Sequence, residues 1–286
     1  GNSLMTIQTI PNLTALTSRS GLSYFCYLLN KAGITDSKQV GLVAQHTINL
    51  WKSQGKKGLT AHPKLIELEK KWYQSVRIKK TPDYSVYDEK IYLAEVWACW
   101  DFYSRKYLKD ILKPKLVPPF GIQKYVKENK SILDLGNGIG FSSIALRQSF
   151  PKNRLIATNV KDSYQWDLNK LLAKYYDYLL ITNDNLNLNK TGDIELTFAS
   201  EYFEHFEEPI DHLSLILEKT KTRILITANA FNTDSIGHFD SYLYKGQRYE
   251  PKAISRLFGK KLRENNYKKL KTKCWNARPA IWIKDG

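Results

Sequence analysis

The sequence predicts an α/β fold in which a mostly parallel sheet follows a helical region. Three observations predict it: alternating strand-like and helical patterns after residue 116, a glycine-rich turn near residue 136, and helical periodicity through the first 112 residues. With 286 residues, the chain has room for one large domain or two smaller ones. We expect a helical domain over residues 1–115 and an α/β domain over residues 116–286.

The first region contains four predicted helices, over residues 24–31, 37–55, 63–77 and 87–112. Gly33 ends the first helix, and Asp36 is the expected N-cap of the second. Prolines at 114, 118 and 119 stop the last helix, so the boundary between the domains is expected there. Such an appendage is expected to recognise the substrate or to act as a lid over the site.

The second region alternates strands and helices, as a parallel sheet requires. An amphipathic segment over residues 120–127 is expected to cover one face of the sheet and to shield the site. Strands are predicted over residues 131–135, 154–158, 178–182, 194–199 and 223–228, followed by a helix over 251–265 and an antiparallel hairpin over 270–275 and 280–284.

A glycine-rich turn follows the first of these strands. Gly136, Gly138 and Gly140 alternate after Asp134, which lets the backbone approach a ligand closely and adopt angles closed to other residues. A dinucleotide fingerprint requires its third glycine one position later, where Phe141 stands. The turn therefore predicts a nucleotide-like cofactor other than NAD.

This Asp-x-Gly-x-Gly-x-Gly run resembles the first motif of class I S-adenosylmethionine-dependent methyltransferases. The order of the predicted elements is similar to the Rossmann-like, seven-stranded sheet of that superfamily, and the resemblance covers residues 116–286. It implies S-adenosyl-L-methionine as the cofactor. The residues that the resemblance assigns to cofactor binding are Asp134, Gly136, Asn137, Gly138, Gly140, Phe141, Asn159, Asp184 and Ser200.

Two of these positions need separate comment. The superfamily pattern has an acidic residue at the end of the second strand, where it binds the ribose hydroxyls, but this chain has Asn159 there. An asparagine hydrogen-bonds a hydroxyl without the strength that a carboxylate charge adds, and Asp162 lies only three residues on. Asp184 is expected to contact the adenine ring, with a plain turn as the alternative.

A second motif, Glu-Tyr-Phe-Glu-His over residues 201–205, follows the fourth predicted strand directly. If this segment is helical, Glu201 faces both Glu204 and His205, because residues three and four apart share a helix face. The spacing resembles the motif of small-RNA 2′-O-methyltransferases and of the O-methyltransferases of ubiquinone biosynthesis. That resemblance implies a divalent metal bound by Glu201, Glu204, His205 and His238, with catalytic roles for the last three.

The expected ligand set of two carboxylates and two imidazoles favours manganese or magnesium, and zinc also fits. A bound cation lowers the pKa of an acceptor hydroxyl, whereas a nitrogen nucleophile needs no such help. The alternative is a metal-free motif, in which the glutamate stabilises a turn and the histidine packs beside the cofactor or acts as a base.

Charge gives a further indication, since 44 Lys and Arg against 28 Asp and Glu produce a net charge of +16. Residues 245–273 alone hold eleven basic and two acidic side chains. This basic segment, together with N-terminal aromatic residues such as Trp72 that lie among lysines, favours a nucleic-acid partner. A general surface field and burial of the aromatic rings in a core are the alternatives.

Together these observations predict a methyltransferase that modifies a nucleic-acid hydroxyl with the assistance of a metal. The alternatives are a small-molecule O-methyltransferase, a DNA or RNA base N-methyltransferase, and a catalytically silent nucleic-acid-binding module. The three cysteines have no paired spacing, which predicts a reducing, cytoplasmic location, and no apolar run is long enough to span a membrane. The sequence leaves the oligomeric state open.

Overall fold

The computed structural model describes residues 18–54, 62–113, 120–183, 193–274 and 278–284. Its α-helices are α2 (Ser18–Lys31), α3 (Ser37–Gln54), α4 (Pro63–Tyr73), α5 (Tyr92–Cys99), α6 (Arg105–Leu112), α7 (Phe141–Ser149), α8 (Tyr164–Tyr176), α9 (Pro209–Thr220) and α10 (Pro251–Glu264). Its strands are β1 (Ser131–Asp134), β2 (Arg154–Asn159), β3 (Leu179–Thr182), β4 (Ile194–Ser200), β5 (Ile224–Ala228), β6 (Tyr242–Tyr244), β7 (Gln247–Tyr249), β8 (Tyr267–Lys269) and β9 (Ala280–Lys284).

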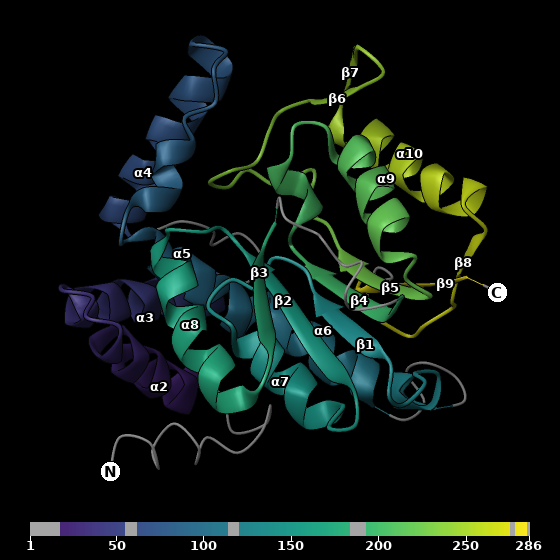
Figure 1. Cartoon of the computed structure of the whole chain (residues 1–286). Helices are drawn as coiled ribbons and strands as arrows, with labels where there is room; N and C mark the ends of the chain where they lie inside the picture. Colours follow the sequence, from purple (N-terminus) through teal and green to yellow (C-terminus); the bar gives the residue numbers. More distant parts are fainter. Residues whose placement is uncertain (1–17, 55–61, 114–119, 184–192, 275–277, 285–286) are drawn as a thin grey trace.

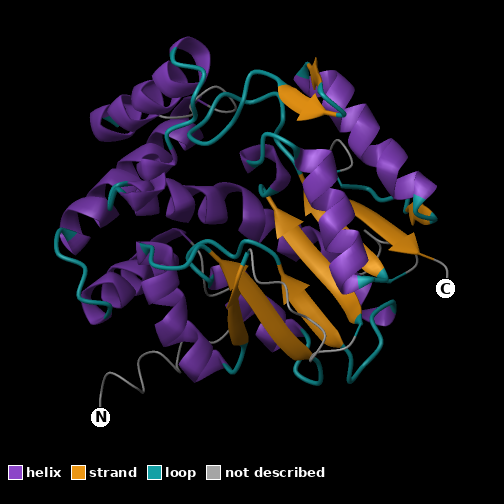
Figure 2. Cartoon of the chain, turned by 45° about the horizontal axis from the view of Figure 1, so that its top comes forward, coloured by secondary structure: helices purple, strands orange, loops and turns teal. Residues whose placement is uncertain are grey.

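Seven strands form one sheet in the order β3-β2-β1-β4-β5-β9-β8. Strands β1 to β5 pair in parallel, and β9 runs antiparallel to both β5 and β8. Every residue of β1 and β5 is buried, as expected of central strands covered on both faces by helices (Figure 2). The predicted Rossmann-like α/β fold with a seven-stranded sheet is confirmed.

The N-terminal helices share one hydrophobic core with the sheet. Phe25 stacks on Trp97 within the helical region, and both belong to the same buried cluster as Leu133 of β1 and Ile226 of β5. Trp72 is also completely buried, which confirms the core alternative for this ring. Residues 114–119, where the boundary is expected, lie outside the described residues, and the division into two domains remains a prediction.

Some predicted elements differ in detail. The helices predicted over 63–77 and 87–112 contain π turns at Gln74–Ile78 and Trp100–Ser104, and the second begins after a 3₁₀ turn at Tyr84–Asp88. The segment 120–127 forms only a 3₁₀ turn, Ile122–Lys124, instead of a covering element. The hairpin of β6 and β7 was not predicted because its strands have only three residues each.

Figure 1 shows how these elements are arranged. Helix α4 and the β6–β7 hairpin both project at the top of the view, whereas α9 and α10 lie together on the right. Within the described ranges, no helix combines the length and apolar character that crossing a membrane requires.

Candidate active site

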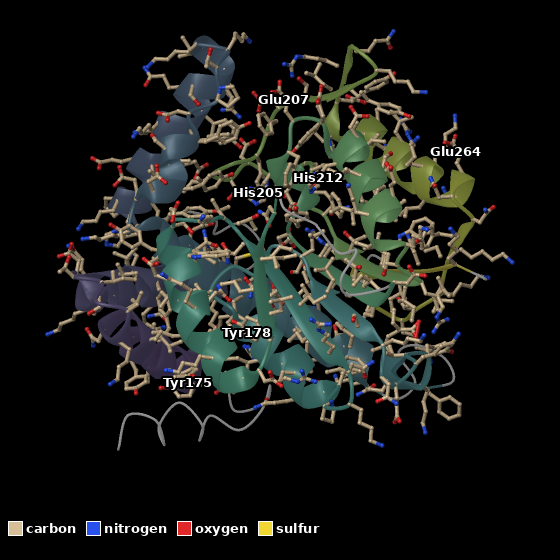
Figure 3. The ribbon with its side chains drawn as sticks, viewed as in Figure 1. Tyr175, Tyr178, His205, Glu207, His212 and Glu264 are labelled. Carbon is tan, nitrogen blue, oxygen red and sulfur yellow. The ribbon has the colours of Figure 1, made fainter. Side chains whose placement is uncertain are left out.

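A cavity of about 1440 Å³ lies at the carboxyl ends of the parallel strands. The glycine turn and Asn159 line one end of it, and Glu201, His205 and His238 line the other. Figure 3 shows His205 between α4 and α9. Because typical ligand sites measure about 300–1,000 Å³, this cavity has room for a cofactor together with an acceptor. Its position is the one where open α/β sheets bind ligands.

The glycine turn borders the cavity with main chain because side chains do not fit there. Gly136 and Gly138 have φ of +64° and +57°, and both line the cavity. A Cβ at Gly136 would lie 2.5 Å from the Tyr202 ring, and one at Gly138 would lie 2.9 Å from Val96 Cγ1. Both the backbone angles and the close contacts therefore require glycine.

Gly140 has a different role from the other two glycines. It begins α7 with φ of +88°, and a Cβ there would lie 2.6 Å from Leu172 and 2.7 Å from Asn169 Oδ1 of α8. It is absent from the residues that line the cavity. Gly140 therefore allows α7 and α8 to pack closely, and its predicted contact with the cofactor remains a prediction.

A network of asparagines holds the glycine turn. Asn159 Nδ2 donates to Asn137 Oδ1 and to the Gly138 carbonyl, each at 2.8 Å, and its Oδ1 accepts from the Val160 amide at 2.7 Å. Asn137 Nδ2 in turn donates to Asn169 Oδ1 at 2.6 Å. Both Asn159 donors are thus used within the protein, which leaves one lone pair of Oδ1 for a ribose hydroxyl. Asn169 was not predicted, since a single asparagine within a helix carries no pattern.

The other predicted cofactor residues lie around the same turn. Asp134 is buried, its Oδ2 accepts from the Ser142 and Ser143 hydroxyls, and burial raises its pKa to about 6. Phe141 is completely buried, with Trp100 edge-on to its ring. The Ser200 and Ser104 hydroxyls share a 2.6 Å hydrogen bond. All except Ser143 line the cavity, whereas Asp184 lies outside the described residues.

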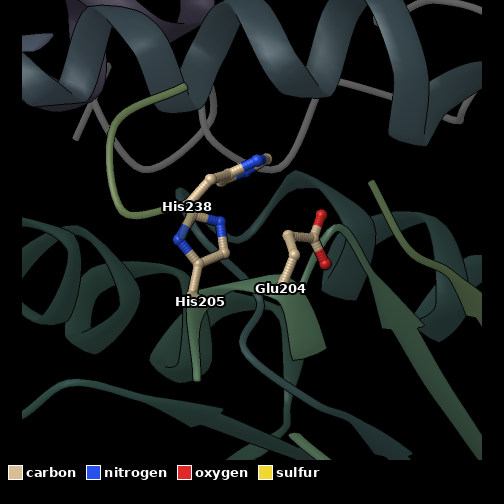
Figure 4. Close-up of side chains that lie close together, drawn as sticks. All are labelled: Glu204, His205 and His238. Atoms are coloured by element: carbon tan, nitrogen blue, oxygen red, sulfur yellow. The ribbon is translucent and has the colours of Figure 1, made fainter. Parts of the chain in front are cut away.

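Glu204, His205 and His238 lie close together (Figure 4), and of these His205 and His238 line the cavity. They come from the 3₁₀ turn Phe203–His205 after β4 and from the loop after β5, and each offers a ligand atom within 4.8 Å of the other two. Neighbouring parallel strands bring these distant segments together at their carboxyl ends. The predicted approach of His238 to Glu204 and His205 is therefore present in the structure.

The electrostatics of this cluster fit a divalent cation. Within the described part of the chain, both Glu204 carboxylate oxygens are buried without a well-formed hydrogen bond, and the Glu201 carboxylate lies close enough to interact with them. Burial, and then the charge of Glu201, raise the Glu204 pKa well above its ordinary value. Burial lowers the pKa of both His205 and His238, so their imidazoles are neutral. His238 Nδ1 donates to the Thr233 carbonyl at 2.7 Å, which leaves Nε2 free to bind a metal.

Glu201 lies beside this cluster and outside the group of three. The expected helix is wrong, because Glu201 has φ of +51° and only a 3₁₀ turn follows. Its Oε1 accepts from the Tyr107 hydroxyl at 2.6 Å, and its carboxylate pairs with Arg278 at 3.0 Å. Arg278 and the Tyr107 hydroxyl therefore compensate the negative charge of Glu201, which the family resemblance had implied would bind a metal. Neither was predicted, since both lie more than 70 residues from Glu201.

Residues of the N-terminal region hold the loop that carries His238. Trp72 Nε1 donates to the His238 carbonyl at 2.6 Å, and the Tyr73 hydroxyl accepts from the Ser235 amide at 2.9 Å. Arg77 binds both carboxylate oxygens of Asp240, at 2.7 and 2.8 Å. The N-terminal region therefore positions the cluster as well as covering it.

We expect Trp72→Phe to weaken Mn²⁺ binding by about 10- to 100-fold, which is the usual effect of losing a group that orients a metal ligand. Phenylalanine fills most of the indole volume but has no N–H for the His238 carbonyl. Calorimetric titration of Mn²⁺ measures the effect. Trp97→Phe is the matched control, because Trp97 is equally buried and its Nε1 has no partner among the described residues. Equal affinities in the two variants would contradict this role of Trp72.

The fold and the cavity define a class: a Rossmann-like α/β protein with a seven-stranded sheet, a glycine turn after β1 and a Glu/His cluster after β4 and β5. No protein-family model matches the sequence, and no curated protein matches it. Among solved structures, the chain is similar to a putative O-methyltransferase from Nostoc punctiforme, with 12% identity, 85% of this chain and 72% of that chain covered, and a TM-score of 0.48.

Two further solved structures have a similar fold. The mitomycin 7-O-methyltransferase MmcR matches with 10% identity, 90% of this chain and 71% of that chain covered, and a TM-score of 0.42. The Methanococcus jannaschii fibrillarin pre-rRNA processing protein matches with 12% identity, 56% and 68% covered, and a TM-score of 0.39. The strand order described above is the basis of the fold assignment.

Proposed function

We propose that this chain is an S-adenosylmethionine-dependent O-methyltransferase whose acceptor hydroxyl lies at the Glu204, His205 and His238 cluster, with a divalent metal. One observation carries the proposal: a single cavity is lined by the glycine turn and by His205 and His238, the two cluster members beside the buried Glu204. A methyl donor and an acceptor bound at its two ends would face each other. Holding two reactants in this way is a large part of catalysis of an in-line displacement.

The residues of the chain have distinct tasks in this proposal. The turn at Gly136 and Gly138 lets the main chain approach S-adenosylmethionine, which supplies a methyl group on a positively charged sulfur. A manganese, magnesium or zinc ion at the cluster would lower the pKa of the acceptor hydroxyl. His205 and His238 are neutral, the form that binds a cation or accepts the hydroxyl proton. The aromatic residues of the N-terminal helices would exclude water.

The nature of the acceptor depends on what lines the cavity. The predicted nucleic-acid partner is supported by the basic segment 245–273, yet none of these residues, all of which are described, lines the cavity. Glu264, at the end of α10, lies at the outer edge of Figure 3, away from His205. The aromatic lining, to which the basic segment contributes no residue, therefore favours the alternative of a small hydroxylated acceptor, and the nucleic-acid acceptor has support from charge alone.

The test is to incubate the protein with labelled S-adenosylmethionine and separate pools of DNA, RNA and small metabolites, with and without a chelator. We expect label in the small-molecule pool and its loss when the chelator removes the metal. Label in nucleic acid would instead support the prediction from charge, with an affinity that falls steeply as salt increases. Absence of S-adenosylmethionine binding at millimolar concentration, measured by calorimetry, would contradict the proposal as a whole.

A further inference from the structure

The cavity contains a carboxylate that the proposed function leaves unused. Glu95 of α5 lines the cavity, and its Oε2 is buried with no hydrogen-bond partner in the described ranges. Burial raises the pKa of the Glu95 carboxyl to about 7, and the Ser235 hydroxyl, which lies beside it, acts in the opposite direction. Buried polar atoms in native proteins are nearly always paired, so an unpaired carboxylate oxygen that faces a cavity indicates a ligand group that donates to it.

The orientation of α5 places Glu95 at the acceptor end of the cavity. Its neighbour Val96 faces the cofactor end, because Val96 Cγ1 would lie 2.9 Å from a Cβ at Gly138. Glu95 instead contacts Ser235, in the same loop as His238. Two consecutive residues of α5 therefore point toward different parts of the cavity. Val96 lies beside the glycine turn, and Glu95 lies beside the loop that carries His238.

The rest of the lining is acidic and aromatic, in contrast to the net charge of +16 on the whole chain. The acidic residues of the lining are Glu95, Asp134, Glu201, Glu207, Glu208 and Asp211. Its basic residues are Lys161, which follows β2, and Arg278, which is paired with Glu201, while Glu207 is paired with Arg248 outside the lining. Tyr84, Tyr87 and Tyr92 also line the cavity, and tyrosine rings attract organic cations. Such a lining favours a cation and disfavours a phosphate or carboxylate.

We propose that the acceptor is a hydroxylated organic amine, whose ammonium group binds Glu95 while its hydroxyl lies at the Glu204, His205 and His238 cluster. This inference rests on the proposed function for the position of the hydroxyl. The charge of the acceptor follows from the lining alone.

Three catechols of different charge test the inference: dopamine is a cation, 4-methylcatechol is neutral and 3,4-dihydroxyphenylacetate is an anion. Binding to the full chain is measured by calorimetry in the presence of S-adenosylhomocysteine and Mn²⁺. We expect dopamine to bind at least about tenfold more tightly than the anion, as a charge-assisted hydrogen bond gives. Equal affinities, a preference for the anion, or no binding of dopamine at millimolar concentration would overturn the inference.

Glu95→Gln keeps the size of the side chain and removes its charge. We expect it to weaken dopamine binding about tenfold, to leave 4-methylcatechol binding unchanged and to retain S-adenosylhomocysteine binding, which shows that the variant is folded. Glu218→Gln is the control, since Glu218 is exposed on α9 and this substitution removes the same charge at a position away from the cavity. A preference for dopamine that survives in Glu95→Gln would overturn the role of Glu95. Dopamine binding without methyl transfer would contradict the proposed function and leave this inference intact.

Discussion

Glu204→Gln is expected to abolish metal binding at the cluster and to lower methyl transfer by at least about 100-fold. Glu204 supplies the carboxylate among the three ligand residues, and both of its oxygens are buried without a well-formed hydrogen bond in the part of the chain that the structure describes. Loss of a group that only orients a ligand costs about 10- to 100-fold in affinity, so loss of the ligand itself should cost more. Glutamine keeps the volume, which limits the effect on folding.

The pKa values of the cluster give this prediction a second measurement. Burial and the charge of Glu201 raise the pKa of Glu204, so its carboxyl carries a proton while no metal is bound. His205 and His238 are already neutral. Metal binding must therefore release one proton, and the affinity should increase as the pH rises toward the Glu204 pKa. Calorimetry of Mn²⁺ in two buffers of different ionisation enthalpy measures that proton.

The control for this prediction is Glu218→Gln, an exposed change of the same kind on α9, which should bind Mn²⁺ and transfer methyl groups like the unaltered protein. Unchanged Mn²⁺ affinity in Glu204→Gln would place the metal elsewhere. Full activity without any metal, together with full activity of Glu204→Gln, would favour the metal-free role that the sequence left open for this motif.

The parts of the molecule that the sequence predicts well are those with a local cause. The central strands are apolar runs that end at turn residues, so β1, β2, β4 and β5 fall within two residues of their predicted bounds. The glycine turn is likewise recognisable from its spacing. The approach of His238 to Glu204 was implied by the family resemblance, and its physical cause in the structure is that β4 and β5 are neighbours, so that residues after them share one edge of the sheet.

The parts that the sequence could not predict depend on contacts between distant segments. Trp72 meets His238 across 166 residues, and Glu201 meets Tyr107 across 94. The left-handed backbone conformation of Glu201 could not be predicted either, because glutamate rarely adopts it and no neighbouring residue in the sequence indicates it. The consequence is specific: the spacing of the motif indicated Glu201 as a ligand, whereas tertiary contacts pair it with Arg278 and Tyr107.

Asn159→Asp is expected to weaken S-adenosylmethionine binding at least about tenfold and to destabilise the protein by about 2–4 kcal/mol. The superfamily pattern alone predicts the opposite, because an acid at this position binds the ribose hydroxyls. In this chain, however, Asn159 Nδ2 donates to Asn137 Oδ1 and to the Gly138 carbonyl. An aspartate would replace that donor with an acceptor, so the buried Asn137 oxygen would lose its partner and face a carboxylate.

Urea denaturation and calorimetric titration of S-adenosylmethionine measure the two effects of this substitution. Asp162→Asn is the matched control, because Asp162 is exposed three residues further on, and its change should alter the free energy of unfolding by no more than about 0.5 kcal/mol. Tighter cofactor binding in Asn159→Asp with an unchanged urea midpoint would show that Asn159 serves the ribose. Weaker cofactor binding together with lower stability would show that Asn159 holds the glycine turn in place. The turn would then have the conformation that cofactor binding needs before the cofactor arrives.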